Sequence, residues 1–271
     1  MLKTVFVGGC MRSGTTVLQA LLCRAKGTND LIDEATLLTS LAHMYRWGLE
    51  TFDDLHHQYF RDPENLRQVA SGWIAGMVDN LAVLSPGVDT IVLKNPASTE
   101  YFPELFELAP EALFVVSVRD PRDAIASMAK ASEKQRAAGM TSSISSAGRN
   151  MAKLSDIYAQ AYAPLAIRQG AAFRRRVRFF KYEDLVSDPG KTVADLADFT
   201  GLDFPEDALE TLWQGASAGH MKDPNYPTFS ESYGKPISPA RVGSASEYLT
   251  ADEIAEVEHH CSALMRHFGY K

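Results

Sequence analysis

Short apolar segments alternate with longer amphipathic segments along most of the chain. The short segments, rich in β-branched residues, lie at residues 5–7, 91–93, 113–118 and 177–180. Helical periodicity appears at residues 36–47, 66–84 and 147–169, and a capping box at residues 250–253 opens a last helix that extends to residue 267. This alternation is typical of a parallel sheet with helical crossovers. We therefore expect an α/β fold with a central parallel sheet flanked by helices, built as one domain over residues 1–271.

Two regions depart from the simple alternation. The helices expected at residues 36–47 and 66–84 both fall between the first two strands, so about residues 35–88 form a helical insertion that could build a lid or a substrate wall. Residues 219–243 are rich in glycine, proline, serine, tyrosine and asparagine, which predicts a long irregular segment. Segments of this kind inside a compact domain are usually functional or disordered.

Composition narrows the class of partner. The 271 residues carry a formal net charge of −7, which gives no general attraction to nucleic acids or anionic membranes, so an anionic ligand must be held by a few placed residues. The cysteines, Cys10, Cys23 and Cys261, are too few and too scattered for a disulfide framework or a zinc site. The sequence shows neither a secretion signal nor an apolar stretch long enough to span a bilayer, and we expect a cytoplasmic protein.

The first predicted strand leads directly into a glycine-rich loop. Its sequence is GGCMRSGTT over residues 8–16, and an apolar helical segment follows. A strand, a glycine loop and a helix in this order direct main-chain N–H groups at a ligand near the positive end of the helix dipole, where phosphate binds. Gly9 and Gly14 have the spacing of a P-loop, and we expect both to allow close approach of the ligand. Thr15 stands where a nucleotide triphosphatase has lysine, and Arg12 supplies the cation of the loop.

A second anion-binding element is predicted after the strand at residues 113–118. Arg119 follows this strand directly, and ligands of open α/β sheets bind at the carboxyl ends of the strands. Asp120 and Pro121 suit the cap and first turn of the next helix, which places Ser127 two turns along it. Arg119 and Ser127 could therefore share one phosphate. The alternative for Asp120, a magnesium ligand as in a Walker B motif, fits less well beside an arginine and a proline.

Four separated segments resemble the sulfotransferases that use 3′-phosphoadenosine 5′-phosphosulfate (PAPS). Residues 9–16 are similar to the family's loop for the 5′-phosphosulfate, in the arginine version found among carbohydrate and tyrosylprotein sulfotransferases. Residues 118–127, VRDPRDAIAS, are similar to its 3′-phosphate motif, which implies that Arg119 and Ser127 bind that phosphate. The contacts implied in the loop are those of Gly9, Met11, Arg12, Ser13, Gly14, Thr15 and Thr16.

The other two segments lie toward the C-terminus. The stretch FKYEDLV resembles the family's Tyr-Glu-Asp-Leu segment, which implies that Tyr182 lies near the nucleotide. Arg241 and Gly243 resemble an Arg-x-Gly loop that folds over adenosine and its 3′-phosphate, so a nucleotide-covering loop is expected at about residues 219–248. The aromatic residue that often follows this glycine closely is missing here, because residues 244–246 are Ser-Ala-Ser.

Three residues are predicted to act in catalysis, namely Glu34, Lys94 and Arg12. Sulfuryl transfer resembles phosphoryl transfer in requiring in-line positioning and stabilisation of charge. Arg12 is expected to meet the leaving 5′-phosphate, and Lys94, in a Lys-x-Pro that resembles the family's, to reach the sulfuryl bridge. Glu34 is the first candidate for the base that the acceptor needs, since tyrosylprotein sulfotransferases have a catalytic glutamate at a similar place, and Asp33 competes with it. Further candidate bases are His43, His56 and His57.

The resulting hypothesis is a sulfotransferase that moves the sulfuryl group of PAPS to a hydroxyl or amine and releases adenosine 3′,5′-bisphosphate, without a metal ion. The acceptor is expected to be a small molecule, a carbohydrate or a peptide, with no nucleic acid or membrane as partner. One alternative is an ATP-dependent small-molecule kinase, which the missing lysine opposes. The other is a nonenzymatic nucleotide-binding protein, against which Lys94 and Glu34 argue.

Overall fold

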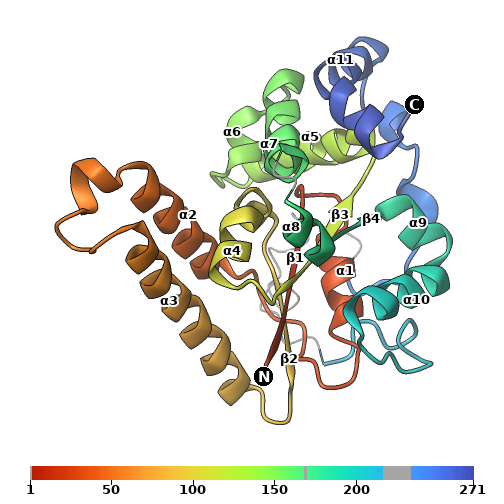
Figure 1. Ribbon diagram of the computed structural model, residues 1–271. Coiled ribbons are helices and arrows are strands. Elements are labelled where there is room, and N and C mark those ends of the chain that lie inside the picture. The colour runs from red at the N-terminus through yellow and green to blue at the C-terminus, as the bar shows by residue number, and fades with distance from the viewer. Residues whose placement is uncertain (1, 168–169, 216–232) are drawn as a thin grey trace.

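Four parallel strands form the centre of the molecule in the computed structural model, which describes residues 2–167, 170–215 and 233–271. The strands are β1 (Lys3–Gly9), β2 (Thr90–Lys94), β3 (Leu113–Val118) and β4 (Val177–Lys181). They lie in the order β2-β1-β3-β4, with Val5 of β1 paired to Val92 on one side and to Leu113 on the other (Figure 1). The strands predicted from the sequence are therefore confirmed, and β1, which leads into the glycine loop, is central.

Helices surround this sheet. Before β3 they are α1 (Thr15–Leu22), α2 (Thr36–Glu50), α3 (Pro63–Leu84) and α4 (Phe102–Leu108). After β3 they are α5 (Pro121–Ala137), α6 (Ser143–Ala147), α7 (Met151–Ile167), α8 (Ala171–Arg176), α9 (Tyr182–Ser187), α10 (Pro189–Thr200) and α11 (Ala251–Phe268). Short helical turns are η1 (Phe52–His56), η2 (Pro96–Tyr101), η5 (Pro239–Arg241) and η6 (Ala245–Glu247). None of the helices described is long and apolar enough to cross a bilayer.

The helix predictions are correct in position and differ at their ends. Both α2 and α3 are slightly longer than the predicted ranges. The predicted capping box is present, since Thr250 accepts a bond from Glu253 N while the Glu253 carboxylate accepts one from Thr250 N. The helix predicted over residues 147–169 is present as α7, Met151–Ile167, but it begins four residues later than predicted. Helix α6 ends at Ala147, and Gly148, with φ 65°, reverses the backbone before α7 begins.

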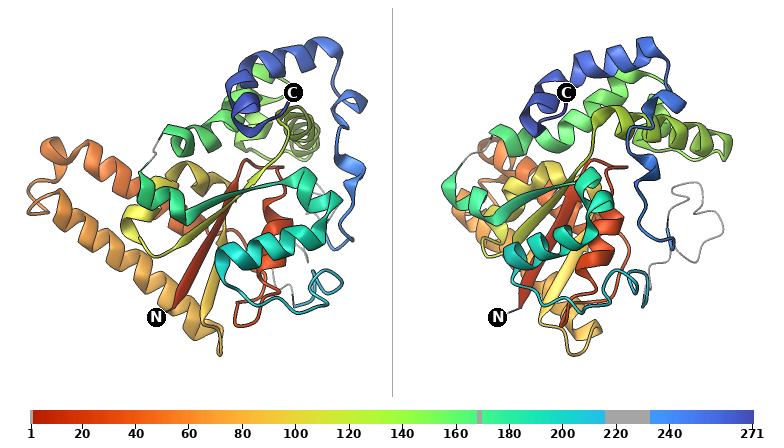
Figure 2. Two further views of the ribbon diagram at one scale, coloured as in Figure 1. Left: turned by 45° about the vertical axis from the view of Figure 1, so that its right-hand side comes forward. Right: turned by 90° about the vertical axis from the view of Figure 1, so that its right-hand side faces the viewer.

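The sheet lies between two layers of helices (Figure 2), and alternate residues of its strands belong to two separate cores. Phe6 and Phe114 belong to a core that also contains residues of α2, α3, α4, α5, α7 and α11. Val7 and Val115 belong to a second core with residues of α1, α9 and α10. Successive side chains of a strand point to opposite faces, so a strand buried on both faces must be apolar throughout. The loop that follows β1 is consequently fixed between two packed layers.

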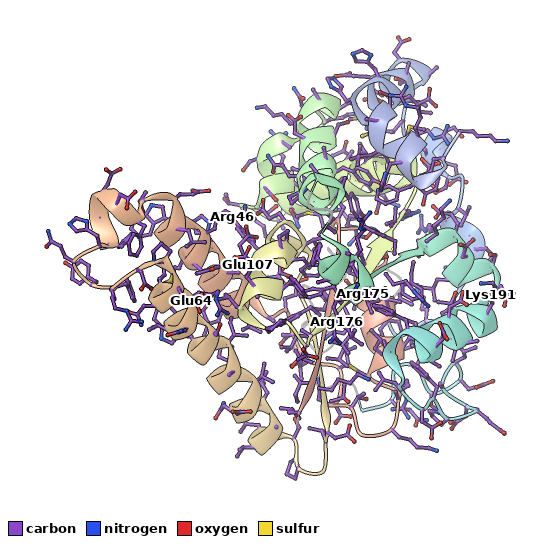
Figure 3. All side chains as sticks on the ribbon, viewed as in Figure 1. Arg46, Glu64, Glu107, Arg175, Arg176 and Lys191 are labelled. Carbon is purple, nitrogen blue, oxygen red and sulfur yellow. The ribbon has the colours of Figure 1, made fainter. Side chains whose placement is uncertain are left out.

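Helices α2 and α3 form a hairpin that projects from the body of the molecule (Figure 1). Polar contacts anchor α2 to α4, because Arg46 Nη2 lies 2.8 Å from Glu104 Oε2 and Tyr45 donates a hydrogen bond to Glu107 at 3.1 Å. Figure 3 shows Arg46 and Glu107 where the hairpin meets α4. The hairpin occupies the segment in which an insertion is expected, and its outer end is formed by η1.

A side chain closes the outer edge of β2. Asn29 is 2% exposed, and its Oδ1 accepts a hydrogen bond from Val92 N at 2.6 Å while its Nδ2 donates one to Val92 O at 3.2 Å. Main-chain N–H and C=O groups at a buried sheet edge are unfavourable unless they find partners. The asparagine amide supplies these partners in place of a further strand, and it helps to hold β2 and its last residue, Lys94, in position.

The substitution Asn29→Ala should lower the free energy of unfolding by about 2–4 kcal/mol, because it leaves both main-chain groups of Val92 buried without these partners. Urea unfolding followed by circular dichroism measures this loss. Asn80→Ala on the exposed surface of α3 is the matched control, and it should change the free energy by less than about 0.5 kcal/mol. Equal losses in the two variants would contradict the edge role of Asn29.

Candidate active site

The glycines of the loop are required by the packing of the protein itself. Gly9 has φ 126°, and a Cβ there would lie 2.2 Å from Ser117 O of β3. Gly14 has φ 96°, and a Cβ there would lie 2.6 Å from the Tyr182 ring. Neither space admits a side chain, and both φ values lie in the region that favours glycine. This packing requirement stands beside the reason expected from the sequence, which is close approach of a ligand.

Buried hydroxyl groups hold the first part of the loop. Thr99 of η2 accepts a hydrogen bond from Gly9 N at 2.7 Å, and Tyr162 of α7 accepts one from the amide of the buried Cys10 at 2.9 Å. The Tyr162 hydroxyl donates in turn to Ser117 O at 2.8 Å. One tyrosine therefore joins the loop to β3, and the amides of residues 9 and 10 are satisfied within the protein.

The second part of the loop presents main-chain donors at the start of α1. Gly14 is the N-cap residue, and no described side chain caps the helix there. First-turn amides have no acceptor within a helix, and the helix dipole makes this end positive. The amides of Thr15 and Thr16 therefore suit an anion. Ser13 differs from Thr15 and Thr16, because its amide and its hydroxyl both donate to Cys10 O, at 3.1 and 2.6 Å. These bonds stabilise the turn of the loop.

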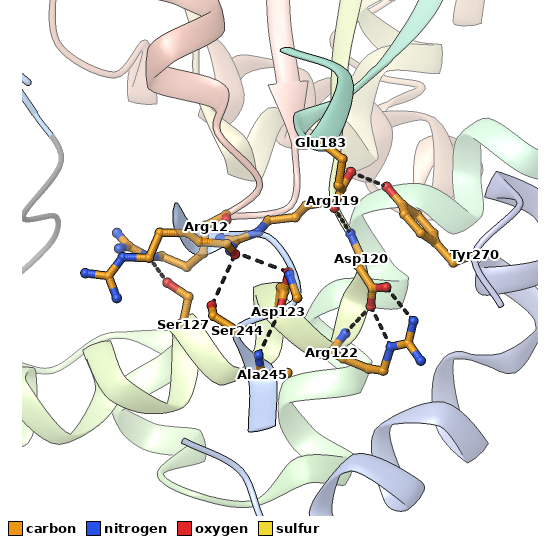
Figure 4. A network of polar contacts seen from close by, with 12 residues as sticks. Arg12, Arg119, Asp120, Arg122, Asp123, Ser127, Glu183, Ser244, Ala245 and Tyr270 are labelled. Carbon is orange, nitrogen blue, oxygen red and sulfur yellow. Dashed lines mark hydrogen bonds and ion pairs between the residues drawn. The ribbon is translucent and has the colours of Figure 1, made fainter. Parts of the chain in front are cut away.

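Met11 and Arg12 form the apex of the loop. Met11 is half-buried and packs against the core that contains α5 and α7. Arg12 has φ 71°, a left-handed conformation that costs a residue with a side chain roughly 1–2 kcal/mol. Its carbonyl accepts a bond from Arg119 Nη1 at 3.2 Å, and its Nε donates to Ser127 Oγ at 3.1 Å (Figure 4). Contacts with Arg119 and Ser127, at the two ends of the predicted 3′-phosphate motif, therefore hold the apex in place.

Arg119 lies where three segments of the chain meet. It is 6% exposed, and its guanidinium lies over the Tyr182 ring, 4.6 Å from the centroid. Its Nη1 donates to Arg12 O, and its Nη2 donates to Arg241 O at the end of η5. The structure thus brings Arg12, Arg119 and Ser127 together, with Ser127 bonded to Arg12 rather than to Arg119.

Residues 241–245, which we call the strap, cover this meeting point. Arg241 and Gly243 are exposed, and Gly243 has φ 69°. The amides of Gly243 and Ala245 donate to the carboxylate of Asp123 on α5 at 2.7 and 2.9 Å. The strap is therefore attached to the helix that also carries Ser127.

The expected nucleotide-covering loop is described only in part, because its residues 219–232 lie outside the described residues. In the described part, the Tyr233 hydroxyl lies 3.1 Å from Thr16 Oγ1, so this segment reaches the start of α1. Tyr248, the first aromatic residue after Gly243, packs elsewhere, with the Arg149 guanidinium 4.9 Å from its ring centroid.

The predicted lysine and glutamate form an ion pair. Lys94 is 3% exposed, and its Nζ lies 2.7 Å from Glu34 Oε1, whose side chain is 41% exposed. Helix α2 starts just beyond, with Ala35 at its N-cap and no described side chain capping it, so Glu34 is not a helix cap. A buried cation is strongly unfavourable without a partner. The need to pair the buried Lys94 ammonium group is enough to explain a carboxylate at Glu34. The same pairing leaves the Glu34 carboxylate directly beside a cation.

The other candidate bases lie at different places. His43 is on α2, and its Nδ1 lies 3.0 Å from the Tyr101 hydroxyl. His56 belongs to η1 and His57 follows it, so both lie at the outer end of the hairpin, away from the glycine loop (Figure 1). Asp33 is exposed and directly precedes Glu34.

Asp120 acts as a helix cap. Its Oδ1 accepts a bond from Arg122 N at 2.9 Å, and its Oδ2 lies 2.6 Å from Arg122 Nη2. Glu183 accepts bonds from Asp120 N and from the Tyr270 hydroxyl, each at 2.9 Å (Figure 4). One oxygen of Asp120 thus caps α5, and the other pairs with the Arg122 guanidinium. Within the ranges described, no group of three or more His, Cys, Asp or Glu is placed to hold a metal ion.

Sequence reasoning misses the buried residues that position the site. Tyr158 and Tyr162 lie one turn apart on α7, and Tyr158 donates to Arg119 O at 2.7 Å. Their spacing indicates one shared face of a helix, which is equally typical of core aromatic residues. The roles of Asp123 and Thr99 leave no signal in the sequence, since their partners are main-chain groups far along the chain.

Comparison with known proteins finds sulfotransferases both by sequence profile and by structure. The sequence profile described as Sulfotransferase family matches residues 4–206. The sulfotransferase domain from the curacin biosynthetic pathway is 16% identical, with a TM-score of 0.61 over 100% of this chain and 99% of that one. The sulfotransferase domain from the Synechococcus PCC 7002 olefin synthase is 21% identical, with a TM-score of 0.57 over 100% and 94% of the two chains.

A eukaryotic structure has the same fold. The mouse sulfotransferase SULT7A1, complexed with PAP, is 14% identical, with a TM-score of 0.51 over 97% of this chain and 85% of that one. At identities this low, the structural likeness shows a common fold only. No curated protein sequence gives a significant match.

The substitution Tyr162→Phe should lower the free energy of unfolding by about 2–3 kcal/mol, because Cys10 N and Ser117 O both lose a buried partner while the ring is kept. Chemical unfolding in urea measures the change. Tyr59→Phe is the control, since Tyr59 is 79% exposed, and it should leave stability within about 0.5 kcal/mol of the unsubstituted protein. A Tyr162→Phe variant as stable as that control would show that the hydroxyl does not hold the loop.

Proposed function

The chain belongs to the sulfotransferase family, and we propose that it transfers the sulfuryl group of PAPS to a hydroxyl or amine of an acceptor. One observation carries the proposal, the convergence of Arg12, Arg119 and Ser127 beside the start of α1, where no described side chain caps the helix. These residues come from two motifs far apart in the sequence, and each motif suits an anion. A cosubstrate with two separate anionic groups would account for both motifs meeting in one place.

The residues present fit such a donor. The first-turn amides of α1 and Arg12 would hold the 5′-phosphosulfate, while Arg119, Ser127 and Arg241 would hold the 3′-phosphate. Arg119 Nε is buried, and it has no hydrogen-bond partner among the described groups. A buried donor without a partner is unfavourable, and a phosphate oxygen would satisfy it.

The other predicted contacts divide into two kinds. Met11, Thr15, Thr16 and Tyr182 would border the nucleotide, because they lie at the apex of the loop, at the start of α1 and against Gly14. Gly9, Ser13, Gly14 and Gly243 would act by giving the loop and the strap their shape.

The pair of Glu34 and Lys94 would supply the chemistry at the acceptor. Glu34 would take the proton of the acceptor hydroxyl while the acceptor oxygen forms its bond to sulfur and the bond from sulfur to the bridging oxygen breaks. Lys94 would then neutralise the negative charge that develops on the bridging oxygen of the 5′-phosphate. Stabilising charge at such positions is the main contribution of enzymes to this type of transfer.

The transfer itself should be seen with labelled donors. The purified protein, given a broad panel of hydroxyl, sugar, phenol and peptide acceptors, should transfer label from [35S]PAPS and none from [γ-32P]ATP with magnesium. Label that moves only from ATP would instead establish a kinase. Donor binding without transfer to any acceptor would favour the nonenzymatic alternative.

Substitutions should separate catalysis from donor binding. Glu34→Gln and Lys94→Met should each reduce kcat by about 10²–10⁴-fold, with the Kd of adenosine 3′,5′-bisphosphate within about twofold of normal. Arg119→Ala should raise that Kd about a hundredfold, because it removes charge-assisted hydrogen bonds. Steady-state kinetics and calorimetry measure the two effects.

Asp33→Asn and His43→Gln are the matched controls, and both should keep a near-normal kcat. Loss of kcat in Asp33→Asn, with Glu34→Gln active, would transfer the role of base to Asp33. Unchanged binding in Arg119→Ala would contradict the assignment of the 3′-phosphate site.

A further inference from the structure

One buried carboxylate attaches the strap to the body of the protein. Asp123 is 3% exposed, its Oδ2 accepts a hydrogen bond from Gly243 N at 2.7 Å, and its Oδ1 accepts one from Ala245 N at 2.9 Å (Figure 4). Gly243 adopts a left-handed conformation between these donors. Each oxygen of the carboxylate therefore binds an amide of the strap.

The same carboxylate adjoins the arginine at the centre of the site. Asp123 Oδ2 lies 3.9 Å from Arg119 Nη2, and that nitrogen donates to Arg241 O of the strap. The Ser244 hydroxyl also donates to Arg241 O, at 3.2 Å. Arg119, the strap and Asp123 thus form a closed ring of contacts, and the direction of the guanidinium depends on where the strap lies.

The charge of Asp123 is unexpected at this position. A carboxylate beside Arg119 repels any anion that approaches the arginine, and burial reduces the screening of that repulsion by water. A site that only had to attract phosphate would gain from a neutral residue here. The contacts with the strap give Asp123 a different purpose, which is to hold other phosphate-binding groups in place.

We propose that Asp123 is a positioning residue that holds the strap closed over the 3′-phosphate and thereby makes donor affinity depend on that phosphate. The inference rests on the proposed function of the site. Asp123 fixes the main chain on either side of Ser244, so that Arg241 O orients the Arg119 guanidinium and the Arg241 side chain stays at the site. Asp123 does not itself contact the ligand.

Asp123 could affect donor binding through its charge or through its hold on the strap, and the two roles predict opposite changes in bisphosphate affinity for Asp123→Asn. The loss of negative charge alone would tighten the binding of adenosine 3′,5′-bisphosphate, because a repulsion disappears. The loss of position would weaken it, because the asparagine Nδ2 is a donor and cannot accept the hydrogen bond of a strap amide. Adenosine 5′-phosphate has no 3′-phosphate, so its binding should respond little to the strap.

Calorimetry on the full chain with these two ligands tests the proposal. In Asp123→Asn, the Kd of adenosine 3′,5′-bisphosphate should rise at least about tenfold, while the Kd of adenosine 5′-phosphate should change less than about twofold. Unchanged or tighter binding of the bisphosphate would overturn the proposal. An equal loss for both ligands would also overturn it, since that pattern indicates general damage to the cradle.

A second pair of variants keeps the charge of Asp123. Ala245→Pro removes one of the two strap donors, and Ser246→Pro inserts the same ring one residue later while leaving both donors in place. The first should reproduce the selective loss of bisphosphate binding, and the second should not. Equal effects of the two prolines, or none from Ala245→Pro, would contradict the role of the strap contacts.

The wild-type chain separates failure of this inference from failure of the proposed function. If the wild-type chain does not bind adenosine 3′,5′-bisphosphate, the proposed function fails and the strap inference fails with it. If the wild-type chain binds this ligand more tightly than adenosine 5′-phosphate and Asp123→Asn keeps the wild-type Kd for both ligands, only the strap inference fails.

Discussion

A buried guanidinium that binds main-chain carbonyls from two distant segments is the constraint on which the site depends. Arg119 directs one nitrogen to the loop at Arg12 O and another to the strap at Arg241 O. Guanidinium donors have fixed directions in one plane, so both carbonyls must occupy defined positions. The buried charge is compensated by these dipoles, by the Tyr182 ring and by Asp123. Arg119 therefore fixes the positions of the loop, β3 and the strap relative to one another.

The ion pair of Lys94 and Glu34 depends on a different segment, the chain that leaves β2. Lys94 is paired with Glu34, the next residue Asn95 donates to Thr39 of α2 at 2.8 Å, and Thr99 holds the amide of Gly9. One short stretch thus contacts both the glycine loop and the start of α2. The position of Glu34 relative to the glycine loop is therefore set by this compact stretch rather than by the projecting hairpin.

The strands and the motifs could be predicted from the sequence because their signals are local. Apolar runs mark strands that are buried on both faces, and the glycine loop joins β1 to α1 within a few residues of the sequence. The break at Gly148 was within reach of the sequence, since a glycine before a new helical pattern is a common stop signal. The contacts of Tyr162 and Asp123 could not be predicted, because both bind main-chain groups that only the tertiary fold brings near.

The enclosure of the loop by α7 has a consequence for its sulfur chemistry. Cys10 lies within the loop, but it is 1% exposed, and burial raises the pKa of its thiol well above the ordinary value. Peroxides, disulfides and electrophiles react with the thiolate, which this environment suppresses. A cradle with an accessible cysteine would be inactivated under oxidative stress. Here the sulfur is shielded and protonated, so we expect Cys10 to resist oxidation in the folded protein.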